Sequence, residues 1–459
     1  MHAFMKRVAI AAALPVIVAT ARADAQEHTG HAARPDTSHS SVTDHMFTRD
    51  LGAGWRILGM AQVFPAVSSG FGSGASDDVT QTEAYATQPA AMFNIESPGS
   101  RVVLRTTLNF EGVTQPDGEL TFGGWGEGFI DRRHPHTLLH EAMLSVNLPD
   151  VAGGSMSVSA GRGFAPYGTD DPMSRPVVKY PTNHHLSQIL ERYTVNAVYL
   201  NRGWSVEAGA FDGAEPEGPY DFGNFSGFNS WSGRVTHRFG GTGVAAPWEV
   251  SASFAHVVET HDGEESASRL ANAFVRHERS YSFGKLYSLI EASLSDPREA
   301  GDEGYFSVLG EVQLTRGRHQ PYARVEVATR PEYERDGAPG TDGFFRYDHD
   351  AHAHAATRWV ITSAGYGYEA TRLPYSARPF IELQHNNAAN ARGDVSATEL
   401  FGTTSFFSVT AGLRLFIGGG PMRMGSYGVL DAMTTHGAMM HDGMSHDGTM
   451  DGMDHTNHH

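Results

Sequence analysis

The sequence predicts an all-β fold, a transmembrane antiparallel up-and-down β-barrel of about sixteen strands. Two independent observations lead to this fold class. First, segments of about ten residues between positions 53 and 417 alternate apolar with polar side chains, as tilted membrane strands do. Second, the connections between these segments are alternately short and long along the chain, as the periplasmic turns and extracellular loops of such barrels are.

The alternation is plain in residues 101–111. Leu104 and Leu108 share one face of the predicted strand, whereas Arg105 and Thr107 lie on the other. A charged or amide side chain recurs on the polar face of segment after segment, which predicts a polar lumen and an apolar exterior, the reverse of a soluble barrel. By this parity, the charged residues expected to face the lumen are Arg105, Arg192, Arg234, Arg238, Arg324, Arg414, Glu207, Glu291, Glu311, Glu326 and Glu382.

About sixteen segments carry this pattern, and an even number returns both termini of a bacterial barrel to the periplasm. They lie at 54–64, 86–95, 101–111, 139–148, 155–163, 190–200, 204–212, 230–239, 248–258, 268–279, 284–294, 304–315, 320–330, 357–369, 377–387 and 405–416. Connections after even-numbered segments are mostly short. Those after odd-numbered segments are mostly long, at 65–85, 112–138, 164–189, 213–229, 331–356 and 388–404. A soluble propeller or sandwich has no reason to sort its loops in this way.

The two ends of the chain are expected to lie outside the barrel. Lys6 and Arg7 precede an apolar run shorter than the roughly 20 residues of a spanning helix, and Ala23-Asp24-Ala25 offers a cleavage site. The predicted organisation is a signal peptide at 1–25, a disordered His-containing extension at 26–52, the barrel at 53–417 and a flexible His/Met/Asp-rich tail at 418–459. It predicts an outer-membrane protein with both termini in the periplasm.

The composition argues against several classes of function. The formal net charge of -18 at pH 7 argues against nucleic-acid binding, which needs basic surfaces. The chain has no cysteine, so its stability must come from a large core or a closed sheet rather than from disulfides. No G-x-S-x-G, H-E-x-x-H or paired C-x-x-C motif occurs, and we therefore expect no enzymatic activity.

The tail carries the sharpest chemical signal in the sequence. From residue 436 onward, imidazole, thioether and carboxylate side chains are interleaved with glycines. Thioethers select Cu(I), whereas imidazole suits Cu(II), Zn(II) and Ni(II), so the mixture predicts metal binding, with copper as the leading ion and zinc as the alternative. A solvated low-complexity tail without a ligand is the other interpretation. The predicted ligands are His436, Met439, Met440, His441, Met444, His446, Met450, Met453, His455, His458 and His459.

A second group of histidines lies in two of the predicted long loops and at the start of a strand, accompanied by Asp131 and Glu141. Two or three imidazoles with a carboxylate could form a zinc or copper site. Because no spacing among them is diagnostic of a metal site, hydrogen-bonded loop anchors are the favoured interpretation. The candidate ligands in this group are His134, His136, His140, His184 and His185.

Two stretches resemble known families. Leu413-Arg414-Leu415-Phe416 is similar to the closing strand of outer-membrane barrels, which typically ends in an aromatic residue, although this chain continues to residue 459. Residues 131–136, the pair His184-His185, and residues 211–216 (F-D-G-A-E-P) resemble the D-R-x-H-P-H, His-His and F-N-G-x-E-P motifs of a poorly characterised bacterial barrel-like family, with Asp212 in place of its Asn. The resemblance implies an association with copper or heavy-metal handling.

These observations predict an outer-membrane barrel that takes part in metal handling, with copper tolerance or trafficking foremost. The tail would bind the metal at the periplasmic mouth of a channel and raise its local concentration there. The alternatives are a general porin-like channel for small solutes and a structural barrel, each with an incidental tail. The expected partners are outer-membrane lipid, the outer-membrane assembly machinery and periplasmic metal-export proteins, and no nucleic acid is expected.

Overall fold

The fold was analysed in a computed structural model of the 459-residue chain. It describes residues 47–72, 80–114, 136–169, 171–181, 186–216, 218–223, 225–241, 246–261, 264–297, 304–333, 353–370, 375–393, 396–418 and 422–433. The predicted signal peptide and the tail from residue 434 onward lie outside these ranges.

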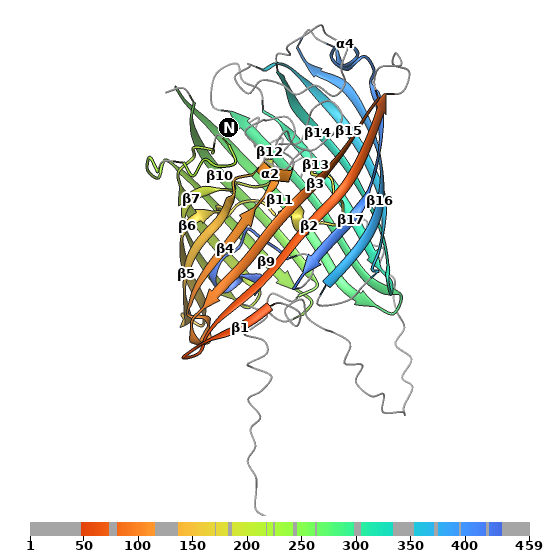
Figure 1. Cartoon of the computed structure of the whole chain (residues 1–459). Helices are drawn as coiled ribbons and strands as arrows, with labels where there is room; N and C mark the ends of the chain where they lie inside the picture. Colours follow the sequence, from red (N-terminus) through yellow and green to blue (C-terminus); the bar gives the residue numbers. More distant parts are fainter. Residues whose placement is uncertain are drawn as a thin grey trace, which may run out of the picture.

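Seventeen strands form one antiparallel sheet in the described part of the chain. β2 to β17 pair in chain order, and β17 also pairs with β2, so sixteen strands close into a barrel (Figure 1). The strands are β1 Phe47–Gly52, β2 Trp55–Gly72, β3 Thr80–Glu96, β4 Val102–Asn109, β5 Leu139–Val151, β6 Gly154–Gly163, β7 Arg192–Asn201, β8 Trp204–Phe211, β9 Ser230–Phe239, β10 Trp248–His261, β11 Glu264–Tyr281, β12 Gly284–Pro297, β13 Phe306–Thr315, β14 His319–Tyr333, β15 Ala353–Tyr368, β16 Tyr375–Arg392 and β17 Ser405–Ile417. The fold class predicted from the sequence is confirmed.

β1 completes the seam of the barrel. β17 ends opposite Ala61, and the first residues of β2 pair instead with β1, from Phe47↔Gly59 to Gly52↔Trp55. β1 therefore supplies hydrogen-bond partners to the part of β2 that β17 does not reach, and unpaired backbone groups are costly in a bilayer. The sheet thus begins six residues before the predicted boundary at 53. The sequence FTRDLG does not predict this strand, because its side chains are all exposed and follow no apolar alternation.

All sixteen predicted segments correspond to strands of the barrel, but several strands are longer than the apolar pattern indicates. β2 and β3 continue as a ladder of polar pairs such as Ser68↔Glu83 and Ser69↔Thr82. The connection between them is therefore 73–79 rather than the predicted 65–85. β16 likewise runs to Arg392. Alternation of hydropathy cannot reveal a strand end in which both faces are polar.

The two faces of the sheet follow the predicted parity. All eleven charged residues assigned to the lumen are buried, with exposed fractions between 0 and 8%. On the outer face, Leu144, Val206, Ile290 and Leu383 are about half exposed, between 50 and 55%. An apolar exterior around a polar interior is the arrangement of a barrel that spans a membrane. Among the described residues, no helix is long and apolar enough to cross a bilayer.

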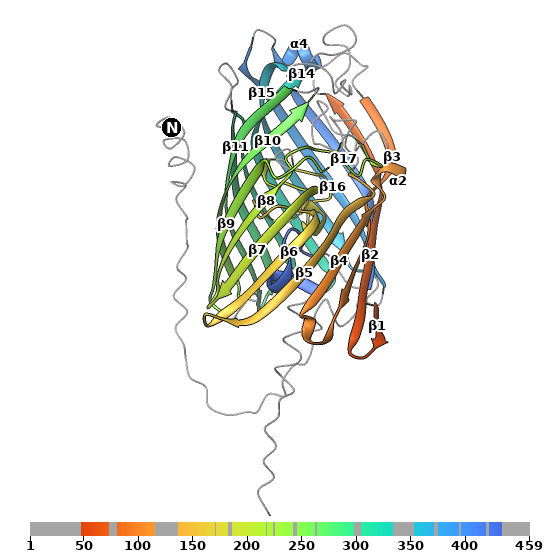
Figure 2. The ribbon, with the colours of Figure 1, turned by 90° about the vertical axis from the view of Figure 1, so that its left-hand side faces the viewer.

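Two segments lie inside this barrel (Figure 2). The first, which we call the inner loop, comprises residues 164–169, 171–181 and 186–191 of the connection between β6 and β7. The second, the plug segment, comprises residues 422–433 after β17, with a short 3-10 helix at Gly428–Leu430, and lies in the lower part of the barrel as drawn. The sequence analysis assigns the plug segment to a flexible tail that begins at 418. Its residues are instead mostly buried against the inner wall.

Candidate functional site

The inner loop follows the inner wall across a large part of the barrel. Gly168 has a φ of +65°, and a Cβ there would lie 1.6 Å from the Ser187 carbonyl oxygen, so only glycine fits this close approach. The contacts of the loop with the wall are Gly168 N to Ser253 Oγ of β10 at 2.9 Å, Arg175 to Glu291 of β12 at 3.2 Å, Val178 N to Glu382 of β16 at 3.2 Å, Gln88 of β3 to Val178 O at 2.8 Å, Arg324 of β14 to Lys179 O at 2.8 Å, and Arg414 of β17 to Pro176 O at 2.9 Å. These polar contacts act together with apolar packing, since Tyr167 and Ile189 of the loop belong to one buried apolar cluster and Val178 belongs to another.

The plug segment makes polar contacts with strands β3 to β6 and with β10 of the wall. Its contacts are Arg423 to both carboxylate oxygens of Glu249 at 2.9 and 3.0 Å, Tyr427 Oη to Glu141 at 2.9 Å, Val429 N to Ser157 Oγ at 3.2 Å, Asp431 to Arg105 at 3.1 Å, and Asp431 to Asn94 at 3.3 Å. Tyr427 also joins the plug segment to the inner loop, since its hydroxyl accepts the Phe164 N–H at 2.8 Å. Arg105 and Glu249 of the wall are thus each paired with an oppositely charged residue of the plug segment.

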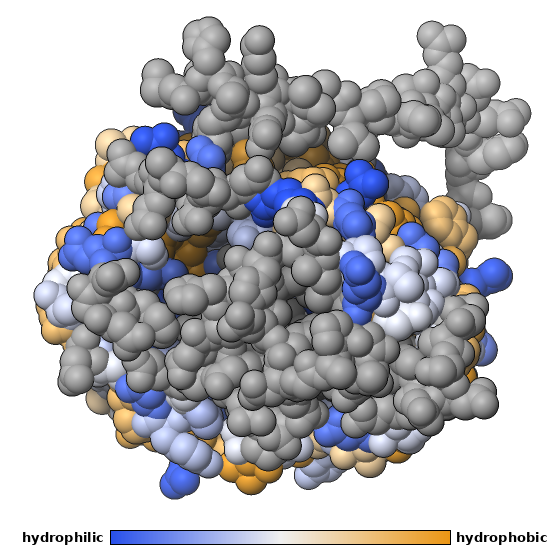
Figure 3. Space-filling model, turned by 90° about the horizontal axis from the view of Figure 1, so that it is seen from above, coloured by the Kyte–Doolittle hydropathy of each residue, from blue (hydrophilic) through white to orange (hydrophobic). Residues whose placement is uncertain are grey.

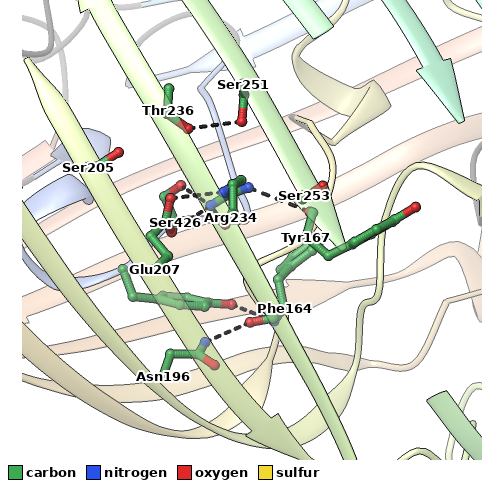
Figure 4. Close-up of polar contacts among 12 residues, drawn as sticks. Phe164, Tyr167, Asn196, Ser205, Glu207, Arg234, Thr236, Ser251, Ser253 and Ser426 are labelled. Carbon is green, nitrogen blue, oxygen red and sulfur yellow. Dashed lines mark hydrogen bonds and ion pairs between the residues drawn. The ribbon is translucent and has the colours of Figure 1, made fainter. Parts of the chain in front are cut away.

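Arg234 of β9 contacts the wall, the inner loop and the plug segment together (Figure 4). Its guanidinium donates to both carboxylate oxygens of Glu207 at 2.7 and 2.8 Å. It also donates to the Gly168 carbonyl at 3.2 Å, the Gly425 carbonyl at 3.0 Å and the Ser426 hydroxyl at 2.9 Å. The planar donor fork of arginine suits such a junction because it can serve several acceptors at once.

β5 contains a β-bulge at His140. Thr107 of β4 pairs with Glu141 and Leu108 pairs with Leu139, which leaves His140 as the extra residue. A bulge can re-aim a side chain, and here both His140 and its neighbour Glu141 are fully buried. Two adjacent residues of one strand therefore carry their side chains into the interior, where parity alone would allow one.

His136 and His140 lie together, with their ring centroids 5.1 Å apart. Nδ1 of His136 is 2.6 Å from a carboxylate oxygen of Glu111 in the short helix α2 (Glu111–Thr114), and Tyr180 of the inner loop donates to the other oxygen at 2.6 Å. Nδ1 of His140 is 2.7 Å from Glu191 Oε1 of the inner loop. A carboxylate from a distant part of the chain thus orients each imidazole.

The Glu111–His136 pair is ionised because each charge stabilises the other. Burial by itself would raise the pKa of Glu111, but the His136 charge and the hydrogen bonds from His136 and Tyr180 lower it to about 2. Burial would likewise lower the pKa of His136, but the charge of Glu111 and the hydrogen bond to it outweigh this effect and raise the pKa. The pair is a charged anchor at the junction of α2, β5 and the inner loop.

Among the predicted metal ligands, the structure describes only His136 and His140, and it brings these two together. His134, His184, His185 and all predicted tail ligands lie outside the described residues. Glu141, which the sequence groups with the histidines, instead accepts hydrogen bonds from Arg105 and Thr107. In the described ranges, no group of three or more His, Asp and Glu side chains is placed to hold a metal ion.

The carboxylate partners of these histidines carry no motif in the sequence. Glu111 lies on the predicted lumen face of the strand 101–111, and this parity is the signal that could have identified it. Glu191 and Asp171 belong to the inner loop, whose path through the lumen has no periodic pattern. The described part of the F-D-G-A-E-P stretch has a local structural role: Asp212 accepts the Ser226 N–H at 2.5 Å, and a Cβ at Gly213 would lie 2.1 Å from the Val258 carbonyl oxygen.

Comparisons with known proteins give matches among solved structures alone. No protein-family model and no curated protein matches the chain, so the resemblance to the D-R-x-H-P-H family stays a prediction. An anion-selective porin from Comamonas acidovorans is 13% identical over 79% of this chain and 100% of its own, with a TM-score of 0.48. OmpT, an outer membrane protein of Vibrio cholerae, is 12% identical over 81% of this chain and 99% of its own, with a TM-score of 0.45.

Replacing Glu111 with Gln should destabilise the barrel by about 3–5 kcal/mol near pH 6, because it leaves a buried charged His136 without its counterion. The lowered pKa of Glu111 means that its contribution is present above about pH 4.5 and is lost as the pH falls toward 2. The raised pKa of His136 means that its contribution is complete below about pH 6.5 and is lost as the pH rises through the raised value.

The difference in unfolding free energy between the wild type and E111Q should therefore be largest between about pH 4.5 and 6.5. Urea unfolding in lipid vesicles, followed by tryptophan fluorescence, measures it. Glu399→Gln is the matched control, because Glu399 is an exposed capping-box residue and Gln can keep that hydrogen bond. An E111Q deficit that stays constant from pH 3 to pH 9 would show that the pair is not ionised.

Proposed function

We propose that the protein is an outer-membrane channel for small polar solutes, narrowed by the inner loop and closed at the short-turn end by the plug segment. The observation that carries this proposal is the nature of the contacts that hold the plug segment. Beside the apolar packing of its methionines, the segment is held by hydrogen bonds and ion pairs to the inner wall, such as Asp431 to Arg105 and Arg423 to Glu249. Polar contacts of this kind can be exchanged for water when a segment leaves a lumen.

The lining of the barrel supports passage of polar rather than apolar solutes. Arginine and glutamate side chains of neighbouring strands face inward together, as Arg324 does beside Glu311 at 2.9 Å. Charges that face a lumen set the selectivity of a pore. Seen from the end that carries the longer connections, the surface is hollowed between the rim residues (Figure 3). In the proposed orientation this end is extracellular, and the short turns and both termini are periplasmic.

Removing the plug segment should increase the conductance of the channel several-fold. The measurement is single-channel conductance in planar bilayers for three proteins: the full chain, a variant that lacks residues 434–459, and a variant that lacks residues 422–459. The first truncation keeps every plug contact and is the matched control. We expect the first two proteins to conduct alike and the third to conduct more.

Equal conductance in all three proteins would contradict the closure of the barrel by the plug segment. No conductance in any of them, with the heat-modifiable band of a folded barrel present on gels, would contradict the channel and favour a structural barrel.

Copper handling through the tail is a second proposal, and it rests on the ligand chemistry of residues 436–459. One observation links it to the barrel: the plug segment, which directly precedes the tail, ends at Met433 against the inner wall. Met433, the last described residue before the tail, therefore lies at the inner wall. Ligands tethered there would raise the metal concentration at the channel entrance.

Deleting residues 434–459 should then lower the copper tolerance of cells that express the protein. Growth at increasing copper concentration is the measurement, and a variant with the tail histidines and methionines replaced by Gln and Leu separates ligand chemistry from tail length. Unchanged tolerance and unchanged cellular copper content in both variants would refute the role of the tail.

A further inference from the structure

Seven buried methionines pack into one cluster at the junction of the wall, the inner loop and the plug segment. Phe164, Leu190 and Tyr427 belong to the same cluster. Methionine often fills irregular gaps in a core. The alternative explanation is that some of these thioethers bind a metal ion. The methionines are Met60, Met92 and Met143 of the wall, Met173 of the inner loop, and Met422, Met424 and Met433 of the plug segment, each 0 to 4% exposed.

A histidine and a carboxylate meet at the edge of this cluster with a gap between them. Nε2 of His140 and Oδ2 of Asp171 are 3.9 Å apart, too far for a hydrogen bond. Both atoms are fully buried, and neither has a hydrogen-bond partner among the described residues. Unpaired buried polar atoms are expensive and call for an explanation, so this gap is a place for a ligand.

The surroundings of His140 are those of a metal-binding imidazole. Its Nδ1 is held by Glu191 at 2.7 Å, and its Nε2, which faces Asp171 at 3.9 Å, is the ring nitrogen that a metal ion can reach. A carboxylate on the second ring nitrogen is the usual way in which proteins orient a metal-binding histidine. The β-bulge at His140 directs this side chain inward, and its ring packs 5.3 Å from the ring of Phe164, a member of the cluster.

Two methionines are close in the chain to these polar atoms. Met143 follows His140 by three residues on β5 and is fully buried. Met173 follows Asp171 by two residues, and its backbone N–H donates to Asp171 Oδ1 at 2.8 Å. The wall and the inner loop therefore each bring one ionisable or imidazole group and one thioether to the same region.

We infer that His140, Met143 and Met173, with Asp171 beside them, bind a soft monovalent cation of the Cu(I) class. Thioether and neutral imidazole ligands favour such an ion. One positive charge would also lie beside the buried carboxylate of Asp171, whose Oδ2 faces Nε2 of His140 at 3.9 Å. Zn(II) fits less well, because the described residues offer no group of three His, Asp and Glu ligands.

This site does not depend on the channel activity proposed above. Its residues come from the wall and the inner loop, so a bound ion would join these two parts, and the plug segment packs against both through the methionine cluster. None of its residues is among the predicted ligands of the tail, which begin at His436.

The test is methyl NMR of the full chain, labelled with [methyl-13C]methionine and titrated with Ag(I), which shares the charge and closed d-shell of Cu(I). Met143→Leu and Met173→Leu assign the two signals with little change in packed volume. Met156→Leu, on β6 outside the cluster, is the matched control. We expect the signals of Met143 and Met173 to shift on addition of Ag(I) and not on addition of Zn(II).

Removing the imidazole should weaken this response. In H140Q the shift of the Met173 signal should need at least about tenfold more Ag(I), the loss typical when the ligand sphere of a metal is disturbed. If H140Q gives no folded barrel, M143L provides the same comparison, since its packing is retained. Unmoved Met143 and Met173 signals while tail methionine signals shift would overturn the proposal, as would an Ag(I) response in H140Q and M143L equal to that of the wild type.

Discussion

The rest of the interior depends on one buried guanidinium, that of Arg234. It forms a two-point ion pair with Glu207 on the neighbouring strand β8. It also donates to the carbonyl of Gly168 in the inner loop, and to the carbonyl of Gly425 and the hydroxyl of Ser426 in the plug segment. A buried charge needs several acceptors to offset its lost hydration. Because these acceptors come from three parts of the chain, the position of Arg234 fixes all three relative to one another.

The closed sheet is the reason why so many buried charges require partners. Strand alternation in a membrane barrel sends alternate side chains into the lumen, and in this chain many of them are charged. Neighbouring strands supply some partners, and the two inner segments supply others, as Asp431 does for Arg105. Charged side chains of the wall are therefore paired either with a neighbouring strand or with one of the two inner segments. The cluster of methionines lies where the wall, the inner loop and the plug segment meet, and it is one of several buried apolar clusters among the polar side chains of the described interior.

Most of the wall is predictable from the sequence, whereas the contents of the lumen are not. Leu104 and Arg105 reveal their faces by parity, and every predicted strand is present. The plug segment resembles the Met- and Gly-containing tail that follows it, and its burial depends on arginines more than a hundred residues away in the chain. His136 and His140 both belong to the histidine group predicted from the sequence, but Glu111 and Glu191 lie 25 and 51 residues from them, beyond any local pattern.

The burial of the plug segment in the lumen is tested most directly by labelling single cysteines, because the chain has none of its own. Leu430 is 6% exposed within the plug segment, and Thr48 is exposed on β1 at the same end of the barrel. A bulky maleimide reagent added to folded protein in detergent or lipid should label Thr48→Cys rapidly and Leu430→Cys only after unfolding. Equally rapid labelling of both cysteines in the folded protein would contradict the account.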